Sequence, residues 1–234
     1  MGSQRDILRG RVAVVKGSTR GLGLGMARLL GHRGAAVVLA SRSGADVAAA
    51  VEQLQTEGIK ASGRPCDTGE LADVEALRDG ALSRGILDIW VNNAGASGVF
   101  GPTASAPIDD FTLVVRTNIL GTFHGSRIAL PVFLAQGPGD LVNVNGHGDQ
   151  GPVALQNAYA SSKGWVRQFT ETLRLETKGT GVRVHGMNPG LVLTDMLGAS
   201  PPSPATSIGW AGCRSSSDYG GRPLTTPPAL SWTS

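Results

Sequence analysis

Residues 12–23 read Val-Ala-Val-Val-Lys-Gly-Ser-Thr-Arg-Gly-Leu-Gly, and this stretch gives the strongest indication of the fold. The apolar run Val12–Val15 predicts a buried β-strand, and the glycine-rich segment after it leads into a predicted helix. Glycines at such a turn let the backbone approach a diphosphate, whose charge meets the free amides and positive dipole of the helix N-terminus. The predicted dinucleotide loop consists of Gly17, Ser18, Thr19, Arg20, Gly21, Leu22 and Gly23.

Short apolar runs continue to alternate with longer helical patterns along the chain. The predicted strands are Val12–Val15, Ala36–Ala40, Ala61–Pro65, Ile89–Val91, Leu141–Val144 and Val182–Met187. The predicted helices are Gly23–Arg33, Ala45–Glu57, Leu71–Arg84, Asp109–Leu134 and Asn157–Lys178. This alternation is typical of βαβ units, so we predict an α/β fold with a Rossmann-like, doubly wound parallel sheet of about six strands.

The end of the second predicted strand bears on the choice of cofactor. An NAD-binding protein usually carries an acid there, which grips the ribose 2′-hydroxyl. Here Ser41 and Arg42 follow instead, and Arg20 of the glycine loop could reach the same spot. A hydroxyl and guanidinium groups suit a 2′-phosphate, so we predict NADP(H) rather than NAD(H). Asp67, after the third strand, is placed either to accept from the adenine amino group or to cap the next helix.

Tyr159 and Lys163 are four residues apart in a predicted helix and therefore share one face. A neighbouring ammonium favours the phenolate and lowers the pKa of a tyrosine. The pair predicts a proton-transfer site. The plain alternative is an amphipathic helix with a packed tyrosine and a solvated lysine.

Further segments complete a recognisable set. They are Asn92-Asn93-Ala94-Gly95 after the fourth strand, Asn118 in the next helix, and Asn188-Pro189-Gly190 with Thr194 after the sixth strand. Together with the glycine loop and the Tyr159/Lys163 pair, they resemble the short-chain dehydrogenase/reductase family from about residue 9 to residue 197.

The resemblance implies a role for each matching residue. Tyr159 would be the general acid in reduction and the base in oxidation, while Lys163 would lower its pKa and hold the nicotinamide ribose. Asn118 would anchor a proton-relaying water, although it could instead satisfy backbone groups in a bent helix. The residues expected to border the cofactor are Asn93, Ala94, Gly95, Pro189, Gly190 and Thr194.

Two positions depart from the family pattern. The family carries a serine thirteen residues before its tyrosine, where this chain has Gly146. Loss of one such donor, which polarises the substrate carbonyl, typically lowers the rate about 10²- to 10³-fold. Asn145 or His147 could supply the hydrogen bond instead. The alternative is that this loop is only a polar turn. The second departure is Lys16, where the family favours threonine; an inward ammonium must pair or neutralise, or else face the cofactor phosphates.

The segments Asp88–Gly95 and Asn143–Gly146 resemble the chlorophyll(ide) b reductase branch, whose members reduce a formyl group on a tetrapyrrole. The helices and seventh strand that family members carry after the Pro-Gly segment are not readable here, so the C-terminus is expected to be atypical or truncated. We predict an NADP-binding Rossmann domain with the catalytic site over residues 1–197. Residues 198–234 are rich in proline and serine and predict a mostly disordered tail.

Composition narrows the other possibilities. Charged residues make up 17% and hydrophobic residues 41%, without an apolar run near the roughly 20 residues of a membrane span. The net charge of +3 is scattered and aromatics are only 5%, which argues against nucleic-acid binding. Cys66 and Cys213 have no metal spacing. We expect a soluble, cytoplasmic protein that forms a homodimer or homotetramer through its long central helices, as the family does.

These observations favour an NADP(H)-dependent oxidoreductase that moves a hydride between nicotinamide and a small-molecule carbonyl or alcohol. The alternative is a catalytically weak or inactive dinucleotide-binding protein, because of Gly146 and the missing substrate lid. A third hypothesis is non-redox use of the pocket, such as isomerisation.

Overall fold

The computed structural model of the chain describes residues 7–190. Two predicted parts of the chain lie outside the described residues. They are the end of the predicted domain, residues 191–197 with Thr194, and the predicted tail, residues 198–234.

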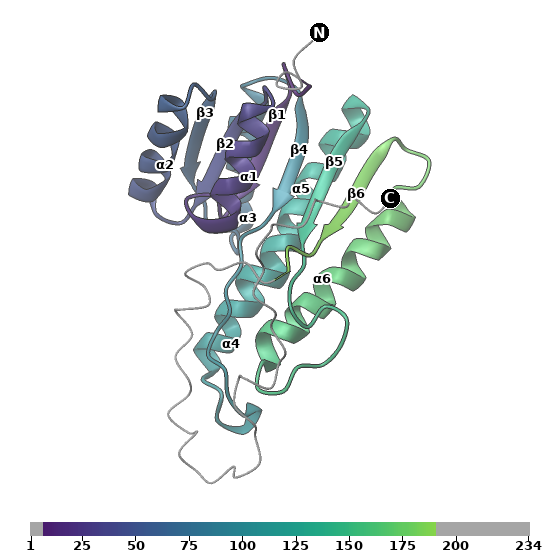
Figure 1. The fold of residues 1–234 in the computed structure, drawn as a ribbon. Helices are drawn as coiled ribbons and strands as arrows, with labels where there is room; N and C mark the ends of the chain where they lie inside the picture. The colour runs from purple at the N-terminus through teal and green to yellow at the C-terminus, as the bar shows by residue number, and fades with distance from the viewer. Residues whose placement is uncertain (1–6, 191–234) are drawn as a thin grey trace.

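Six parallel strands form one sheet in the order β3-β2-β1-β4-β5-β6 (Figure 1). The strands are β1 (Val12–Lys16), β2 (Ala36–Ser41), β3 (Ala61–Pro65), β4 (Leu87–Asn92), β5 (Gly139–Val144) and β6 (Val182–Met187). The order reverses direction between β1 and β4, which makes the sheet doubly wound. All six predicted strands are present, and the predicted Rossmann-like α/β fold is confirmed.

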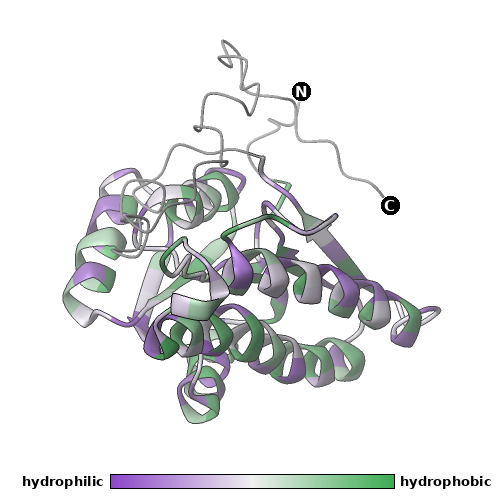
Figure 2. Cartoon of the chain, turned by 90° about the horizontal axis from the view of Figure 1, so that it is seen from below, coloured by the Kyte–Doolittle hydropathy of each residue, from purple (hydrophilic) through white to green (hydrophobic). Residues whose placement is uncertain are grey.

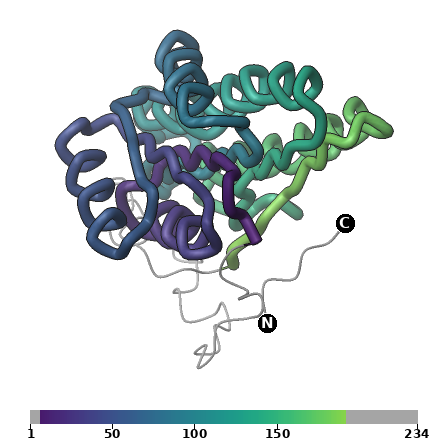
Figure 3. Tube along the Cα trace, turned by 90° about the horizontal axis from the view of Figure 1, so that it is seen from above, coloured from purple at the N-terminus to yellow at the C-terminus, as the bar shows by residue number. Residues whose placement is uncertain are grey.

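Helices cover both faces of the sheet (Figure 3). The helices are α1 (Gly21–His32), α2 (Gly44–Thr56), α3 (Leu71–Leu82), α4 (Ile108–Val114), α5 (Gly121–Gln136) and α6 (Asn157–Glu176), with a short 3₁₀ turn at Thr103–Ser105. One core cluster joins the sheet to α1 and α2, and the other joins it to α3, α5 and α6. Hydrophobic and hydrophilic segments interleave along the helices, as expected when one side of each packs on the sheet (Figure 2).

The predicted helix over residues 109–134 is not one regular α-helix. A π-helical segment, Val115–Leu120, separates α4 from α5. Asn118 lies inside this segment, and its buried amide bonds to groups outside the helix. Single π turns inside α-helices occur frequently at functional sites.

Lys16 at the end of β1 points into the core rather than toward the cofactor loop. Its side chain is 1% exposed, and Nζ donates to the Gly121 carbonyl at the start of α5. Burial lowers the pKa of Lys16 to about 7, against a partial opposing effect of Cys66. The prediction that an inward lysine must pair or neutralise is therefore met, and the reading in which it faces the cofactor phosphates is wrong.

The buried lysine makes stability depend on pH. Between pH 7 and about 10.5 the unfolded chain binds a proton at Lys16 that the folded chain lacks, so stability rises with pH across this window. We expect Lys16→Met to make the free energy of unfolding less dependent on pH and to stabilise the protein at neutral pH by a few kcal/mol. This magnitude follows from about 1.4 kcal/mol for each unit by which the pKa is lowered.

Urea unfolding of wild type and Lys16→Met at pH 7 and pH 9.5 measures the effect. Lys60→Met, at an exposed lysine, is the control and should keep the wild-type slope. Equal pH slopes in wild type and Lys16→Met would contradict this account of Lys16.

Candidate active site

The glycine loop fits tightly against the end of β4. Gly17 has φ +66°, and a Cβ there would lie 2.7 Å from the Cα of Ala94. A Cβ at Gly23 would overlap the Gly17 carbonyl and lie 2.5 Å from Asn93 Nδ2. Both positions therefore require glycine, one for its backbone conformation and both for space.

The loop delivers an open helix N-terminus to the carboxyl edge of the sheet. Helix α1 begins at Gly21, and its N-cap, Arg20, makes no side-chain capping hydrogen bond. The first turn contains no acidic residue. Free amides and the helix dipole at this point fit the diphosphate of a dinucleotide.

The side chains of two predicted cofactor-binding residues, Ser18 and Asn93, hydrogen bond to the backbone around the glycine loop. Ser18 is buried; its Oγ donates to the Val15 carbonyl (2.6 Å) and accepts from the Ala40 amide (3.1 Å). Asn93 Nδ2 donates to the carbonyls of Gly17 (2.8 Å) and Lys16 (3.1 Å). These side chains shape the loop, which leaves contact with a phosphate to backbone amides.

The predicted 2′-phosphate residues lie at the end of β2 and the start of α1. Ser41 is the last residue of β2, and Arg42 follows it with an exposed side chain. Arg20 is also exposed. No acidic side chain within residues 7–190 pairs with Arg42, so its guanidinium is available to a phosphate.

Asp67 does not cap helix α3, whose N-cap is Glu70. Its Oδ1 accepts from the Gly69 amide (2.9 Å), and its Oδ2 lies 3.7 Å from Nη2 of Arg116. The capping alternative is therefore wrong, and the carboxylate stabilises its own loop. Arg116, which also bonds Glu70, was not singled out from the sequence because its partners are distant along the chain.

A buried polar network ties the helix that carries Tyr159 to the sheet. Asn92 Nδ2 donates to Oδ1 of Asn143 (2.8 Å), and Asn143 Nδ2 donates to Oγ1 of Thr170 in α6 (3.0 Å). Trp90 Nε1 donates to Asn92 Oδ1 (2.9 Å). The network fixes α6 relative to β4 and β5. From the sequence, Asn143 stood only in the segment that resembles the chlorophyll(ide) b reductase branch and Thr170 stood in no motif, so neither was given a role.

Tyr159 and Lys163 share one face of α6, as predicted, with Lys163 Nζ 5.6 Å from the centre of the tyrosine ring. Lys163 is buried, and its Nζ donates to the Val144 carbonyl (2.9 Å). Burial lowers the pKa of Lys163 to about 8, while Asp149 acts to raise it. The Tyr159 hydroxyl forms no hydrogen bond with any residue in the described part of the chain.

The pKa of Tyr159 shifts in the direction opposite to the expected one. Burial raises it, and the charge of Asp149 raises it further. The ammonium that was expected to lower this pKa is bonded to the Val144 carbonyl instead. The expected lowering of the phenol pKa is therefore not the net result, because burial and the charge of Asp149 together set its direction.

Gly146 gives the tyrosine hydroxyl its space. A Cβ at this position would lie 2.7 Å from Tyr159 Oη. Of the two suggested replacements for the family serine, His147 is exposed and lies 3.4 Å from Gln156 through Nδ1. Asn145 lies against Gly186, and its Oδ1 is buried without a partner in the described residues. Neither side chain hydrogen bonds to Tyr159 in residues 7–190.

The Asn118 side chain is fully engaged. Its Oδ1 accepts from the Ala96 amide (2.8 Å), and its Nδ2 donates to the Ala96 carbonyl (2.9 Å) and to Ser162 Oγ (2.9 Å). The amide thus connects the loop after β4 with α6. Any water-anchoring role of Asn118 falls to its main chain.

The loops after β5 and β6 meet beside the tyrosine. Asn188 Oδ1 accepts from the Gly190 amide (3.0 Å), and Asn188 Nδ2 donates to Asp149 Oδ2 (3.0 Å). This bond brings the Pro189-Gly190 segment to the loop that also contains Gly146. Asp149 was not assigned a role from the sequence.

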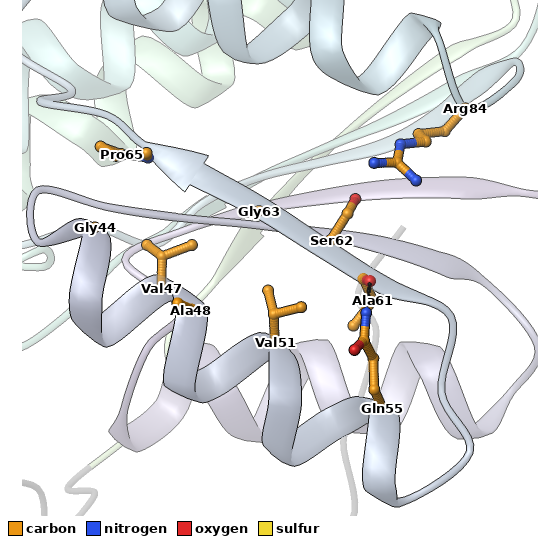
Figure 4. Close-up of a pocket in the computed structure, with 10 residues that line it drawn as sticks. All are labelled: Gly44, Val47, Ala48, Val51, Gln55, Ala61, Ser62, Gly63, Pro65 and Arg84. Carbon is orange, nitrogen blue, oxygen red and sulfur yellow. Dashed lines mark hydrogen bonds between the residues drawn. The ribbon is translucent and has the colours of Figure 1, made fainter.

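A separate hollow of about 340 Å³ lies between α2 and the edge strand β3 (Figure 4). Val47, Val51 and Arg84 are among its lining residues, and none of the predicted site residues is. Within residues 7–190, no helix has the length and apolar character to cross a bilayer, and no three metal-ligating side chains gather.

A family model described as short chain dehydrogenase matches residues 11–204. The chain belongs to this family. It is 36% identical over 192 residues to the chlorophyll(ide) b reductase NOL of Arabidopsis thaliana, a chloroplastic protein, covering 79% of this chain but only 55% of that one.

Solved structures agree with the fold. An actinorhodin polyketide ketoreductase variant with NADPH is 35% identical with a TM-score of 0.76, covering 84% of this chain and 74% of that chain. A short chain dehydrogenase/reductase from Burkholderia phymatum with NAD is 30% identical with a TM-score of 0.78, covering 82% and 69%. The chain is thus an oxidoreductase of the short-chain type that uses a nicotinamide dinucleotide.

The glycine contacts predict a sharp difference between two alanine substitutions in one helix. We expect Gly23→Ala to weaken NADPH binding at least tenfold, about 1.4 kcal/mol, because its methyl group would collide with the Gly17 carbonyl. Gly25→Ala is the matched control, since a Cβ there meets nothing within 4 Å. Quenching of tryptophan fluorescence by NADPH measures both, and equal affinities would refute this role for Gly23.

Proposed function

We propose that the protein is an NADP(H)-dependent carbonyl reductase and alcohol dehydrogenase in which Tyr159 donates or accepts the proton. The bound cofactor would supply a hydride from nicotinamide C4 to the carbonyl carbon. Tyr159 Oη would give its proton to the carbonyl oxygen as the C=O π bond becomes a C–H and an O–H bond. The observation that carries the proposal is the Tyr159 hydroxyl, which has no hydrogen-bond partner among residues 7–190 and lies beside the buried Lys163.

We assign further roles as proposals. Lys163 is a buried cation next to the tyrosine, and its charge would stabilise the phenolate left after proton transfer. Asn118 would keep the loop after β4 in register with α6. The proposed cofactor-binding residues are Gly17, Ser18, Thr19, Arg20, Gly21, Leu22, Gly23, Ser41, Arg42, Asp67, Asn93, Ala94, Gly95, Tyr159, Lys163, Pro189, Gly190 and Thr194.

The preference for NADP(H) is argued from charge. Ser41 and Arg42 stand where an acid would select NAD, and Arg42 is exposed at the end of β2. A similar structure was solved with NADPH and another with NAD, so the family alone does not decide.

A formyl tetrapyrrole is the substrate class that we propose to test first. The Arabidopsis relative is named a chlorophyll(ide) b reductase, and the segments Asp88–Gly95 and Asn143–Gly146 resemble that branch. The alternative of an inactive dinucleotide-binding protein gains no support from these relatives, which are named as reductases. The cytoplasm remains our prediction for location, although that relative is chloroplastic.

Self-association through the long central helices is also proposed. Phe123 of α5 and Phe169 of α6 lie with ring centres 6.1 Å apart, and Trp165 stacks on Phe169 at 4.7 Å. Phe123 is exposed, so this aromatic surface offers apolar area to a second copy. A monomer in sedimentation velocity at micromolar concentration would contradict the proposal.

Turnover tests the proposed chemistry. We expect purified protein to oxidise NADPH with at least one carbonyl in a panel of aldehydes, ketones and formyl tetrapyrroles. Tyr159→Phe should lower kcat by about 10²-fold or more while NADPH binding is retained, because only the proton donor is removed. Binding without turnover of any carbonyl would favour the inactive alternative, and product without cofactor consumption would favour non-redox chemistry.

Cofactor choice is tested at Arg42. We expect Arg42→Ala to lower kcat/KM for NADPH about tenfold or more, because a charge-assisted bond to the 2′-phosphate is lost. The value for NADH, which has no such phosphate, should stay within about twofold. Arg33→Ala, at a half-buried arginine that follows α1, is the control. Equal losses with both cofactors would contradict the assignment.

A further inference from the structure

Asp149 is a buried acid in the loop between β5 and α6. It is 9% exposed, and its amide donates to the Gly146 carbonyl (3.1 Å). Its Oδ2 accepts a hydrogen bond from Asn188 Nδ2 (3.0 Å). This partner is neutral, so the hydrogen bond fixes the carboxylate without cancelling its charge.

Two glycines hold this loop against the start of α6. Gly148 has φ +91°, and a Cβ there would lie 2.6 Å from the Cα of Ala160, the residue after Tyr159. Gly146 lies next to the tyrosine hydroxyl in the same way, since its Cβ would be 2.7 Å from Oη. The loop therefore packs directly on the turn that carries Tyr159, and the position of Asp149 relative to the phenol is fixed by packing.

The charge of Asp149 acts on both members of the pair. Burial is the larger influence on both groups: it raises the pKa of Tyr159 and lowers that of Lys163 to about 8. The charge of Asp149 adds to the rise for Tyr159 and opposes the fall for Lys163, because a nearby negative charge disfavours the phenolate and favours the ammonium. Other titratable groups around this turn are Lys163 itself, His147 in the same loop and Asp110 of α4, which borders Asn157 and Ala158. Within the described residues, Asp149 is the charge that shifts the tyrosine.

We propose that Asp149 is a positioning residue of this site: its carboxylate, held by Asn188, keeps Tyr159 protonated and Lys163 charged, and so prepares the site to give a proton to a carbonyl rather than to take one from an alcohol. The inference rests on the proposed function above. It assigns a working direction to the site, which the family does not supply.

The physical consequence is a difference between the two directions of reaction. Reduction requires the phenol, which Asp149 favours across the neutral pH range. Oxidation requires the phenolate, which Asp149 disfavours, so the onset of alcohol oxidation moves to higher pH. In reduction, the carboxylate also favours return of a proton to the phenolate once the substrate has been protonated.

A spectroscopic titration tests the charge without any turnover. The chain has two tyrosines, Tyr159 and Tyr219, so Tyr219→Phe leaves one phenol whose ionisation is read from ultraviolet absorbance. In that background, Asp149→Asn keeps an acceptor for Asn188 and removes only the charge. We expect the titration midpoint of Tyr159 to move to lower pH in Asp149→Asn and to stay near wild type in Asp149→Glu.

The control is Glu171→Gln, which removes an exposed charge on the same helix and should leave the midpoint unchanged. Circular dichroism at each pH identifies points at which a variant has unfolded. A midpoint that does not move in the folded Asp149→Asn variant overturns the inference, whatever the activity of the protein.

Rates in both directions provide the second readout. We expect Asp149→Asn to shift the pH profile of alcohol oxidation to lower pH and to raise kcat for oxidation relative to kcat for reduction at pH 7.5. An unchanged profile in an active enzyme also overturns the inference. If no carbonyl is turned over, the proposed function fails, and the titration alone supports or overturns the role of Asp149.

Discussion

Two adjacent asparagines at the end of β4 hold the two halves of the site together. Asn93 donates to the Gly17 carbonyl and so fixes the glycine loop. Asn92 donates to Asn143, which reaches Thr170 in α6. A buried amide left without its partner costs about 1–3 kcal/mol, so these bonds strongly favour a single arrangement of loop, sheet and helix. The separation between the cofactor loop and the tyrosine depends on them.

Buried charge is the second feature that organises the molecule. Lys16 and Lys163 each lose water and bond to a backbone carbonyl, and both have a lowered pKa for that reason. Their consequences differ because their neighbours differ. Lys16 lies among core residues and affects mainly stability. Lys163 lies beside the ring of Tyr159, and the charge of Asp149 acts on both of these side chains. Burial of an ammonium group therefore affects mainly stability at Lys16 and the proposed acid-base chemistry at Lys163.

The absence of a side chain at Gly146 changes how the site is understood. From the sequence it was a missing hydrogen-bond donor. In the structure it is also the space beside the tyrosine hydroxyl, and a side chain there would contact Oη. Replacement donors from Asn145 or His147 find no support in the contacts of those side chains, because one faces Gly186 and the other the surface. Among the described residues, Tyr159 is thus the side chain that we expect to donate a hydrogen bond to the carbonyl oxygen of a substrate.

The sequence alone predicted the six strands, a doubly wound parallel sheet and the pairing of Tyr159 with Lys163, because these follow from the alternation of apolar runs with helical patterns and from spacing within one helix. Three features became visible only in the folded protein: the direction in which Lys16 points, the π segment that interrupts the central helix, and the contact between Asp149 and Asn188 near the tyrosine. The direction of the Tyr159 pKa shift is also a feature that only the folded protein reveals. Burial and the approach of residues distant in the chain set that direction, and neither is encoded in local spacing.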